Sequence, residues 1–511
     1  MKNFIKPLTY LGLAICFISC EHLDDFIGDD GGGEDDAPQE IVNIDFDYHS
    51  TIQVGGEGAA EISAFDPSTN KLFVVNVEIN EISSFDISDI NNVVQLSPVV
   101  CLQDGAPNSV AVSNGKLAVA IEAPTKQDKG FIELFDTTTQ QEINVFNVGA
   151  LPDMVTFTPD GKYIVVANEG EPNDDYTIDP KGIISIINIE SGEVYNLGFD
   201  AFNSQEADLE SQGFRVFGPH ATLAMDVEPE YVAVSDDSKT AWVTLQENNG
   251  VAVVNLETKQ IEAIVPLGFK DYSAMGNEID PSDKDDTKAL RSVPVYGMYQ
   301  PDAIAYYNVD GMDYVVTANE GDARDYDGYS EEERLEDFML DETVFPDAAT
   351  LQLEENLGRL KVTNTLGDID GDGDYDAIYN YGARSFSIWS GDGQLVYDSG
   401  NDIAIQTLLL TPGAFNGNDG RSDDKGAEPE AVTIQKIGDK QILFVGLERN
   451  NQVMVYDISN PSAPEFIQIL ETAGDVGPEG IIVIAAEDSP TGKELLVVSN
   501  EVSGTVTFYE N

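Results

Sequence analysis

Short apolar runs, most of them closed by a glutamate, recur along the whole chain. The runs are rich in β-branched and aromatic residues and are bounded by Gly, Pro, Asn, Asp and Ser, a pattern typical of strands. No segment shows a sustained helical period, so the sequence predicts an all-β fold. Seven such runs imply seven similar units, and their closing glutamates are Glu78, Glu122, Glu169, Glu247, Glu320, Glu448 and Glu501.

The stretch from Glu228 to Gly268 shows one unit most clearly. It holds four apolar runs separated by turn residues, and the runs read YVAVS, AWVTLQ, GVAVVNL and IEAIVPL. Four short strands in about 40 residues match one blade of a β-propeller. We therefore expect a seven-bladed β-propeller of the WD40/YVTN type over residues 41–511. Six or eight blades are the alternatives, because the fifth unit is heavily interrupted.

The two ends of this region are expected to meet in one blade. The last unit supplies only three apolar runs, while residues 41–54 hold a run that belongs to no full unit. An incomplete blade leaves an open strand edge, which favours pairing with another strand. The N-terminal strand is therefore predicted to complete the last blade and close the ring.

A second marked position precedes the run that opens each unit. The seven positions are Glu61, Asn108, Asp153, Glu230, Asp302, Glu430 and Glu479, and all but Asn108 are acidic. In a propeller the first strand of a blade begins, and the second ends, at the same rim of the central channel, so both sets of residues should converge there. Long insertions at 171–181, 200–227, 270–300, 322–381 and 401–427 should emerge on the same rim. Unpatterned loops of such length are usually functional or disordered.

The charge balance excludes some partners. The chain has 26 Lys plus Arg against 93 Asp plus Glu, a formal net charge of −67. Such a surface disfavours nucleic acid and anionic membranes, and it favours cations or basic molecules. Most of these carboxylates are expected to form an ordinary solvated surface.

Carboxylates crowded around a channel mouth need either protons or cations, because like charges raise each other's pKa values. Their hard oxygen atoms suit Ca²⁺ or Mg²⁺, and Ca²⁺ tolerates irregular sites better. The predicted metal ligands of this acidic rim are Glu169, Glu230, Glu247, Glu320, Glu430, Glu448, Glu479 and Glu501. The alternative is architectural: each glutamate could cap a turn or bind backbone amides between blades.

A sharper metal signal lies in the fifth unit, in GDIDGDGDYDAIY. The spacing places alternate carboxylates around one cation, and Gly373 allows the tight turn. The predicted calcium-loop residues are Asp368, Asp370, Asp372, Asp374 and Asp376, with the Asp374 backbone carbonyl as a further ligand. The loop is no EF-hand, because its twelfth position is Tyr379 rather than a bidentate Glu. A plain acidic solvent loop is the alternative.

Other chemistries have few candidates. The chain has three His and three Cys, so a zinc site built on these residues is not expected. There is also no Gly-x-Ser-x-Gly motif and no sign of an organic cofactor. Arg324, Arg384 and Arg449 are best interpreted as salt-bridge partners, although with metal ions they could hold a phosphate or carboxylate.

The N-terminus resembles an export signal. Residues 1–20 carry lysines, an apolar stretch and the ending Phe-Ile-Ser-Cys, which resembles a bacterial lipobox. Cys20 is therefore predicted to be lipidated, anchoring an exported protein to the outer membrane, with exposure on the cell surface as one arrangement; a plain cleaved signal is the alternative. Residues 21–40 are expected to form an acidic flexible linker.

Several long motifs resemble the choice-of-anchor I family: NEGEPNDDYTIDPKG, TANEGDARDY, GDIDGDGDYDAIYNYGARSFSIW, GLERNNQVMVYDIS, GPEG and SNEVSGTVTFYEN. The resemblance covers residues 41–511. It implies a propeller-like surface protein with a variable anchor, similar to the mesenchyme-specific cell-surface glycoprotein of animals, and some members carry an alkaline-phosphatase label.

Two functional hypotheses follow. The first is a lipid-anchored binding module whose acidic face holds Ca²⁺ and an unknown ligand or surface partner. The second is a calcium-dependent phosphoesterase, in which metals held by rim carboxylates activate water. Its expected residues are Glu169, Glu230, Glu320, Glu430 and Arg324.

Overall fold

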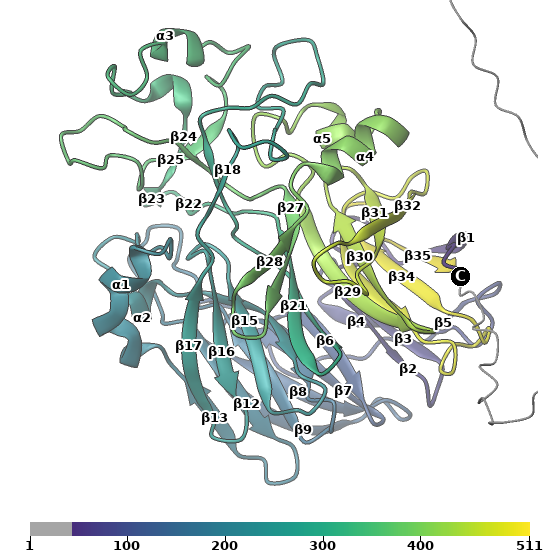
Figure 1. Ribbon diagram of the computed structural model, residues 1–511. Helices are drawn as coiled ribbons and strands as arrows, with labels where there is room; N and C mark the ends of the chain where they lie inside the picture. The colour runs from purple at the N-terminus through teal and green to yellow at the C-terminus, as the bar shows by residue number, and fades with distance from the viewer. Residues whose placement is uncertain (1–42) are drawn as a thin grey trace, which may run out of the picture. The chain divides into compact units, whose positions relative to one another are not determined.

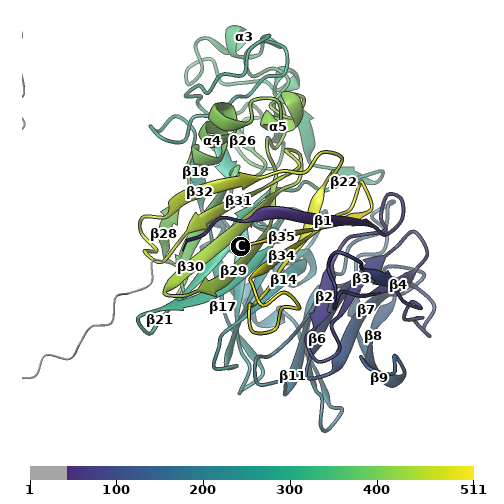
Figure 2. The same ribbon diagram turned by 90° about the vertical axis from the view of Figure 1, so that its right-hand side faces the viewer.

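Four-stranded antiparallel sheets make up most of the chain (Figures 1 and 2). The computed structural model describes residues 43–511; the predicted signal peptide, Cys20 and the acidic linker lie outside this range. Seven sheets of four strands are present within it. Together with the short helices reported below, they confirm the prediction of an all-β fold.

The sheets follow one another along the chain and are named here in that order. The first holds β2 (Ser63–Asp66), β3 (Lys71–Asn76), β4 (Glu81–Asp86) and β5 (Val94–Gln95). The second holds β6 (Ala106–Ser113), β7 (Lys116–Glu122), β8 (Lys129–Asp136) and β9 (Glu142–Ala150). The third holds β10 (Pro152–Phe157), β11 (Tyr163–Asn168), β12 (Ile183–Asn188) and β13 (Val194–Leu197).

The fourth sheet holds β14 (Pro229–Val234), β15 (Thr240–Leu245), β16 (Gly250–Asn255) and β17 (Gln260–Pro266), which confirms the four strands expected in this unit. The fifth holds β20 (Ile304–Val309), β21 (Met312–Asn319), β27 (Ser385–Ser390) and β28 (Leu395–Asp398). The sixth holds β29 (Pro429–Ile437), β30 (Lys440–Leu447), β31 (Gln452–Asp457) and β32 (Glu465–Leu470).

The seventh sheet combines the two ends of the described chain. It holds β33 (Pro478–Ile484), β34 (Leu495–Asn500), β35 (Thr505–Glu510) and β1 (Asp47–Gln53). β1 pairs antiparallel with β35 from Asp47 opposite Glu510 to Gln53 opposite Thr505. The strand at the start of the described residues thus completes a sheet formed at the end of the chain, as Figure 2 shows.

Each sheet packs on the next through an apolar core. The first strand of every sheet contacts the first strand of the following sheet, and β33 in turn contacts β2. A separate cluster of buried side chains joins each neighbouring pair, including the seventh and first sheets. Strands such as β11 are therefore buried at every position, which explains why their sequences are continuously apolar rather than alternating.

The five insertions build a region that periodicity did not predict. β18 (Phe269–Asp271), β19 (Tyr296–Met298), β26 (Tyr379–Asn380), β25 (Lys361–Thr363) and β24 (Glu332–Arg334) form a five-stranded sheet. β22 (Asp325–Tyr326) and β23 (Tyr329–Ser330) form a small hairpin. A core of its own, around Tyr272, Leu335 and Ile378, supports the five-stranded sheet, which Figure 1 shows above the four-stranded sheets.

Helices among residues 43–511 are short and lie in these insertions. They are η1 (Asp200–Gln205), α1 (Glu206–Glu210), α2 (Leu223–Asp226), η2 (Leu335–Asp337), α3 (Ala348–Leu351), α4 (Asp402–Leu410) and α5 (Phe415–Asn418). Over the part of the chain that the structure describes, none of them has the length and apolar character needed to cross a membrane.

Candidate functional site

A β-bulge at the start of the first strand places most of the repeated acids. The register with the second strand shifts between Pro152 and Met154, and again between Pro478 and Gly480, so that Asp153 and Glu479 lie in the bulges. The same shift follows Pro107, Pro229 and Pro429, at Asn108, Glu230 and Glu430. A bulge breaks the alternation of a strand and redirects a side chain. This local geometry explains how acids at the ends of apolar strands can gather.

Of these bulge residues, Asn108, Asp153 and Glu479 line a cavity of about 320 Å³. Every one of the seven sheets contributes to its wall. The acidic residues of the wall are Glu61, Glu122, Asp153, Glu169, Glu171, Asp302 and Glu479, and Lys126 is its one basic residue. Tyr231 and Met154 also line this cavity, and both border a second cavity of about 500 Å³ with a more apolar wall.

The acidic side chains of the cavity wall have raised pKa values. Burial, followed by repulsion from neighbouring carboxylates, raises the pKa of Glu61 and of Glu479 to about 8. The same two causes raise the pKa of Asp153 to about 7 and hold that of Asp302 well above its ordinary value. Burial and repulsion from neighbouring carboxylates also raise the pKa of two further rim acids, Glu169 and Glu230. Without a cation, Glu61 and Glu479 therefore retain protons near neutral pH.

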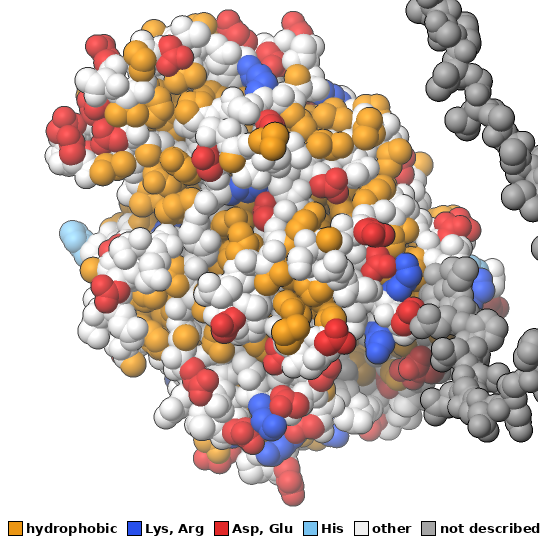
Figure 3. Space-filling view, in the orientation of Figure 1, with side chains coloured by type: hydrophobic (Ala, Val, Ile, Leu, Met, Phe, Trp, Pro, Cys, Tyr) orange, Lys and Arg blue, Asp and Glu red, His pale blue; other side chains and the backbone are white. Residues whose placement is uncertain are grey.

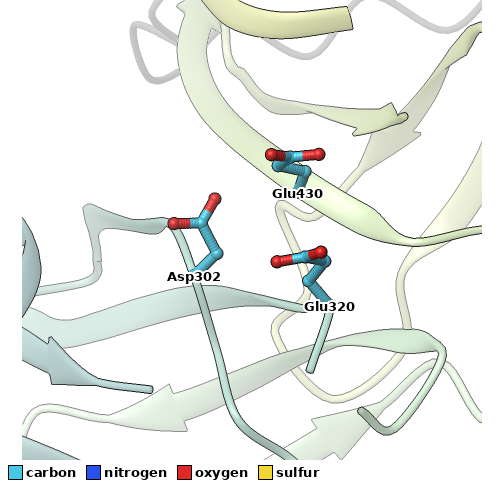
Figure 4. Close-up of side chains that lie close together, drawn as sticks. All are labelled: Asp302, Glu320 and Glu430. Carbon is cyan, nitrogen blue, oxygen red and sulfur yellow. The ribbon is translucent and has the colours of Figure 1, made fainter. Parts of the chain in front are cut away.

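Asp302, Glu320 and Glu430 form a close group of rim acids, drawn in Figure 4. One carboxylate oxygen of each lies within 4.8 Å of the others. Asp302 precedes β20, Glu320 follows β21, and Glu430 lies at the start of β29, so two neighbouring sheets build the group. We call these three residues the rim trio.

Several oxygens in and near the rim trio have no partner. Oε2 of Glu430 is shielded from solvent and accepts no hydrogen bond, and the same holds for Oε2 of Glu230. Glu247 is only 7% exposed, and its Oε2 is also unpartnered. Buried polar atoms without partners are rare in native proteins, since each carries a desolvation cost. Unpaired carboxylate oxygens at a rim of this charge are suited to cations.

A second acidic group shares Glu320 but is already neutralised. Glu320, Glu428 and Glu448 also lie within 4.8 Å of one another. Arg449 binds Glu428 at 3.1 Å and Glu448 at 2.6 Å, and Arg421 binds Glu428 at 2.7 Å. This group is therefore an ion-pair network.

The remaining predicted rim residues are placed as follows. Glu169 and Glu479 line the cavity, while Glu501 raises the pKa of both Glu61 and Glu479 by repulsion. Glu78 instead accepts a hydrogen bond from the Gly56 amide at 2.7 Å, which is the architectural role that was the alternative for these glutamates.

The predicted salt-bridge role of Arg324 is confirmed. Its guanidinium is 1% exposed and binds Asp226 at 2.5 Å and Glu228 at 3.0 Å. The ring of Phe217 packs against the guanidinium of Arg324. The same ring packs against Arg215, which forms a buried ion pair with Glu331. These contacts bind the insertion after β21 to the insertion before β14. Because Asp226 and Glu228 neutralise Arg324, it is not free to hold an anion.

The other two arginines also hold the insertions. The predicted salt-bridge role of Arg384 is wrong for the described residues: its guanidinium instead donates to the backbone carbonyls of Asp280 at 2.8 Å, Ser422 at 3.0 Å and Asp424 at 2.6 Å. Arg449 belongs to the ion-pair network described above. Sequence reasoning missed the partners Asp226 and Glu331, since they lie in insertions where no repeat marks a position, and Glu228, which lies just before the marked position Glu230.

The Asp-rich loop is only partly arranged as expected. Asp368, Asp370 and Asp376 lie within 4.8 Å of one another, whereas Asp372 belongs to neither acidic group of this loop. Asp376 also lies within the same range of Asp374 and of Asp341, a residue that the motif does not include. A bridge between Leu340 and Tyr375 brings Asp341 to the loop. Burial and nearby carboxylates raise the pKa of Asp374 to about 6.

Acidic side chains outnumber basic ones over the face shown in Figure 3, in keeping with the net charge. The two described histidines, His49 and His220, do not belong to any of the four metal-compatible groups found among residues 43–511. Within this range, oxygen ligands are therefore the ones available to a metal.

Two curated proteins show similarity to parts of the chain. Gigasin-3a of Magallana gigas is 29% identical over 189 residues, which cover 31% of this chain and 66% of that protein. The mesenchyme-specific cell surface glycoprotein of Strongylocentrotus purpuratus is 25% identical over 338 residues, or 57% of this chain. The matched segments span 66% and 41% of the lengths of these two relatives.

Two solved structures are similar in overall arrangement. Hydrazine synthase of Kuenenia stuttgartiensis superposes with a TM-score of 0.48 at 14% identity, covering 89% of this chain and 96% of that chain. The β-propeller domain of Myceliophteria thermophila Cps50 (Swd1) gives a TM-score of 0.46 at 8% identity, covering 91% and 100%. Both superpositions are loose, so the sheet pairing and packing described above define the fold.

The choice-of-anchor I domain model matches residues 61–461, which is most of the chain. The resemblance carried by the sequence motifs is thereby confirmed. The protein belongs to the choice-of-anchor I domain family.

Proposed function

We propose that the protein is a cell-surface β-propeller of seven blades that binds Ca²⁺ at its acidic rim and, through it, a ligand. Seven four-stranded sheets, the contacts between their first strands, and an apolar core between every neighbouring pair support the blade count. Pairing of β1 with β35 supports closure of the ring by the N-terminal strand, since it covers an otherwise open edge.

Family membership and one relative support the cell-surface location. The family name refers to variable anchoring, and the sea-urchin relative is named as a cell surface glycoprotein. Lipidation of Cys20 in the outer membrane would supply the anchor in this chain, and residues 21–40 would act as the linker. Labelled fatty acid should enter the wild type and not C20A; equal labelling of both would remove the lipid anchor from the proposal.

One observation carries the cation proposal: the rim trio is crowded and partly buried but lacks enough positive side chains. Glu430 and Glu230 each hold a solvent-shielded oxygen without a donor. No ion pair reaches Asp302 or Glu430 within the described residues, and Lys425 is the one cationic side chain bound to Glu320. Ca²⁺ is favoured over Mg²⁺ because it accepts irregular arrangements of oxygen ligands.

The Asp-rich loop is the second proposed Ca²⁺ position. Asp368, Asp370 and Asp376 supply three converging carboxylates, and Asp341 with Asp374 extends the group through Asp376. Exposed acidic groups occur without ions, so this position rests on the Asp-x-Asp-x-Asp-Gly spacing together with the convergence. A bound ion here would hold the loop onto the segment that contains Asp341.

Calorimetric titration with Ca²⁺ after dialysis against a chelator tests both positions. The wild type should bind Ca²⁺ and gain thermal stability, while D302N/E430Q should lose the rim component. A matched control is E190Q/D439N, which removes two exposed acids away from the trio. Unchanged Ca²⁺ binding in D302N/E430Q would overturn the rim site.

The phosphoesterase remains the second hypothesis from the sequence. Its carboxylates lie at the rim, but Arg324 is held by Asp226 and Glu228 and does not add an anion-binding group. A screen of phosphomonoesters and diesters with Ca²⁺ checks this hypothesis. Turnover that disappears in E169Q/E320Q would favour it over the binding module.

A further inference from the structure

Lys425 is a cationic side chain held inside the acidic rim. It belongs to the insertion between β28 and β29, and its side chain is 12% exposed. The Nζ atom donates to Oε1 of Glu320 at 2.7 Å. Gln246 donates to the other oxygen, Oε2, at 3.0 Å. Glu320 is thus fixed from two sides, and only one of the two donors is charged.

The other carboxylates near Lys425 depend on it less. Asp322 lies 3.5 Å from the Nζ atom, but its side chain is 52% exposed, so solvent screens its charge. Glu428 lies 3.7 Å away and already binds Arg421 and Arg449. The positive charge of Lys425 therefore acts mainly on Glu320 and, through it, on the rim trio.

The number of charges in the rim trio is larger than the charge of Lys425. Within the trio, Asp302, Glu320 and Glu430 carry three negative charges when ionised, and Lys425 is the one basic side chain of the described residues that pairs with any of them, which leaves two of these charges uncompensated. Glu479 adds repulsion to Asp302 and Glu430 from outside the trio. One divalent ion neutralises that remainder, whereas a monovalent ion leaves charge uncompensated and a trivalent ion adds an excess. Uncompensated charge is expensive at a buried position.

We propose that Lys425 sets the charge preference of the rim trio, matching it to one divalent cation. This inference rests on the proposed cation site. It makes Lys425 a specificity-determining residue that does not ligate the ion. It also gives the insertion after β28 a direct role at the rim.

Removing the charge should strengthen binding of highly charged ions. A trivalent ion gains more than a divalent ion when a neighbouring positive charge is lost, because repulsion scales with the charge of the ion. In K425M the hydrogen bond from Gln246 still orients Glu320. We expect La³⁺ to gain about tenfold in affinity relative to Ca²⁺.

Calorimetry with Ca²⁺ alone and La³⁺ alone provides the test, on the whole protein. The rim component is the part of each isotherm that D302N/E430Q lacks. K425R keeps the charge and should keep the wild-type La³⁺/Ca²⁺ ratio. K440M is the matched control, because Lys440 forms an ion pair with Asp457 on the sixth sheet, away from the trio. Circular dichroism verifies that each variant is folded.

The outcomes separate the two proposals. A higher La³⁺/Ca²⁺ ratio in K425M alone supports the role of Lys425. The wild-type ratio in K425M, with a rim component still present, overturns that role and leaves the cation site standing. If K425M does not fold, a raised ratio in K425Q supports the role and an unchanged one overturns it. No rim component in the wild type overturns the proposed site, and this inference with it.

Discussion

Two acidic groups of the same rim differ in where their positive charge comes from. Asp226 and Glu228 are buried beneath the insertions and bind Arg324, which is equally buried. Asp302, which lines the cavity, lies close to Glu430, and no basic side chain of the described residues pairs with either. In the first group an internal guanidinium pairs with both carboxylates, and we call this group completed; in the second, Asp302 and Glu430 have no such partner and need protons or a cation.

The comparison shows that acidity alone does not identify a binding site. Both groups contain acids that the protein shields from water, and both lie where insertions meet the sheets. What distinguishes them is the count of internal counter-ions. Unpaired oxygens such as Oε2 of Glu430 mark the place where an external ion is missing.

The largest expected effect comes from breaking the completed group. R324M should destabilise the protein by about 3–5 kcal/mol, because it leaves Asp226 and Glu228 buried without a counter-ion. Urea unfolding measures this change. The control K239M removes a pair whose side chains are more than half exposed, and it should cost about 1 kcal/mol or less. A loss in R324M as small as that of K239M would contradict the comparison.

The second prediction concerns the incomplete group. D302N/E430Q removes repulsion at the mouth, so the chelated protein should be as stable as the wild type or more stable. Saturating Ca²⁺ should stabilise the wild type by about 2.7 kcal/mol at a concentration 100 times the dissociation constant. The variant should lack the part of this gain that comes from the rim. Thermal melting with and without Ca²⁺ checks both statements, and an equal gain in both proteins would contradict them.

The third prediction uses pH. Folding raises the pKa of Glu61 and Glu479 from 4.5 to about 8, so the folded state binds more protons than the unfolded state between these values. In chelator, the contribution of these two groups to the free energy of unfolding should be greatest at pH 4.5 and below, and it should fall as the pH rises to 8. The fall should exceed about 1 kcal/mol, since one pKa unit corresponds to about 1.4 kcal/mol.

Denaturant unfolding at several pH values tests this trend. E61Q/E479Q should flatten the profile, because glutamine does not titrate. Added Ca²⁺ should restore stability at pH 8 by replacing the lost protons. A profile in the wild type that is flat or rises toward pH 8 in chelator would contradict the electrostatic account of the mouth.

The smallest expected effect concerns the Asp-rich loop. D370N should weaken Ca²⁺ binding there while changing the stability of the chelated protein by less than about 0.5 kcal/mol, since the side chain is exposed. Hydrogen exchange of residues 366–378 should slow on addition of Ca²⁺ in the wild type and respond less in D370N. D341N should weaken the same response, because Asp341 shares this group. If Ca²⁺ leaves exchange unchanged in the wild type, the loop position is wrong.

From the sequence, the acids of the repeated strands could be predicted, but the residues that the insertions bring to them could not. Most acids of the cavity could be found because they recur at one phase of a repeated strand, as Asp153 and Glu479 do, whereas Glu171 lies in an insertion. Lys425, Arg324 and Asp341 could not, because they come from insertions without any period. Only folding brings Lys425 to Glu320 across more than 100 residues. The five-stranded sheet in the insertions was also missed, because strands of two or three residues are too short to show a period.

The most direct test of the central claim is anomalous diffraction from a crystal soaked in Ca²⁺. The account predicts a peak between the carboxylates of Asp302, Glu320 and Glu430, with Lys425 still bound to Glu320. It also predicts no ion between Asp226 and Glu228, where Arg324 lies. Ordered carboxylates at the trio with no peak, under conditions that occupy other Ca²⁺ sites, would contradict the claim that a missing counter-ion marks the site.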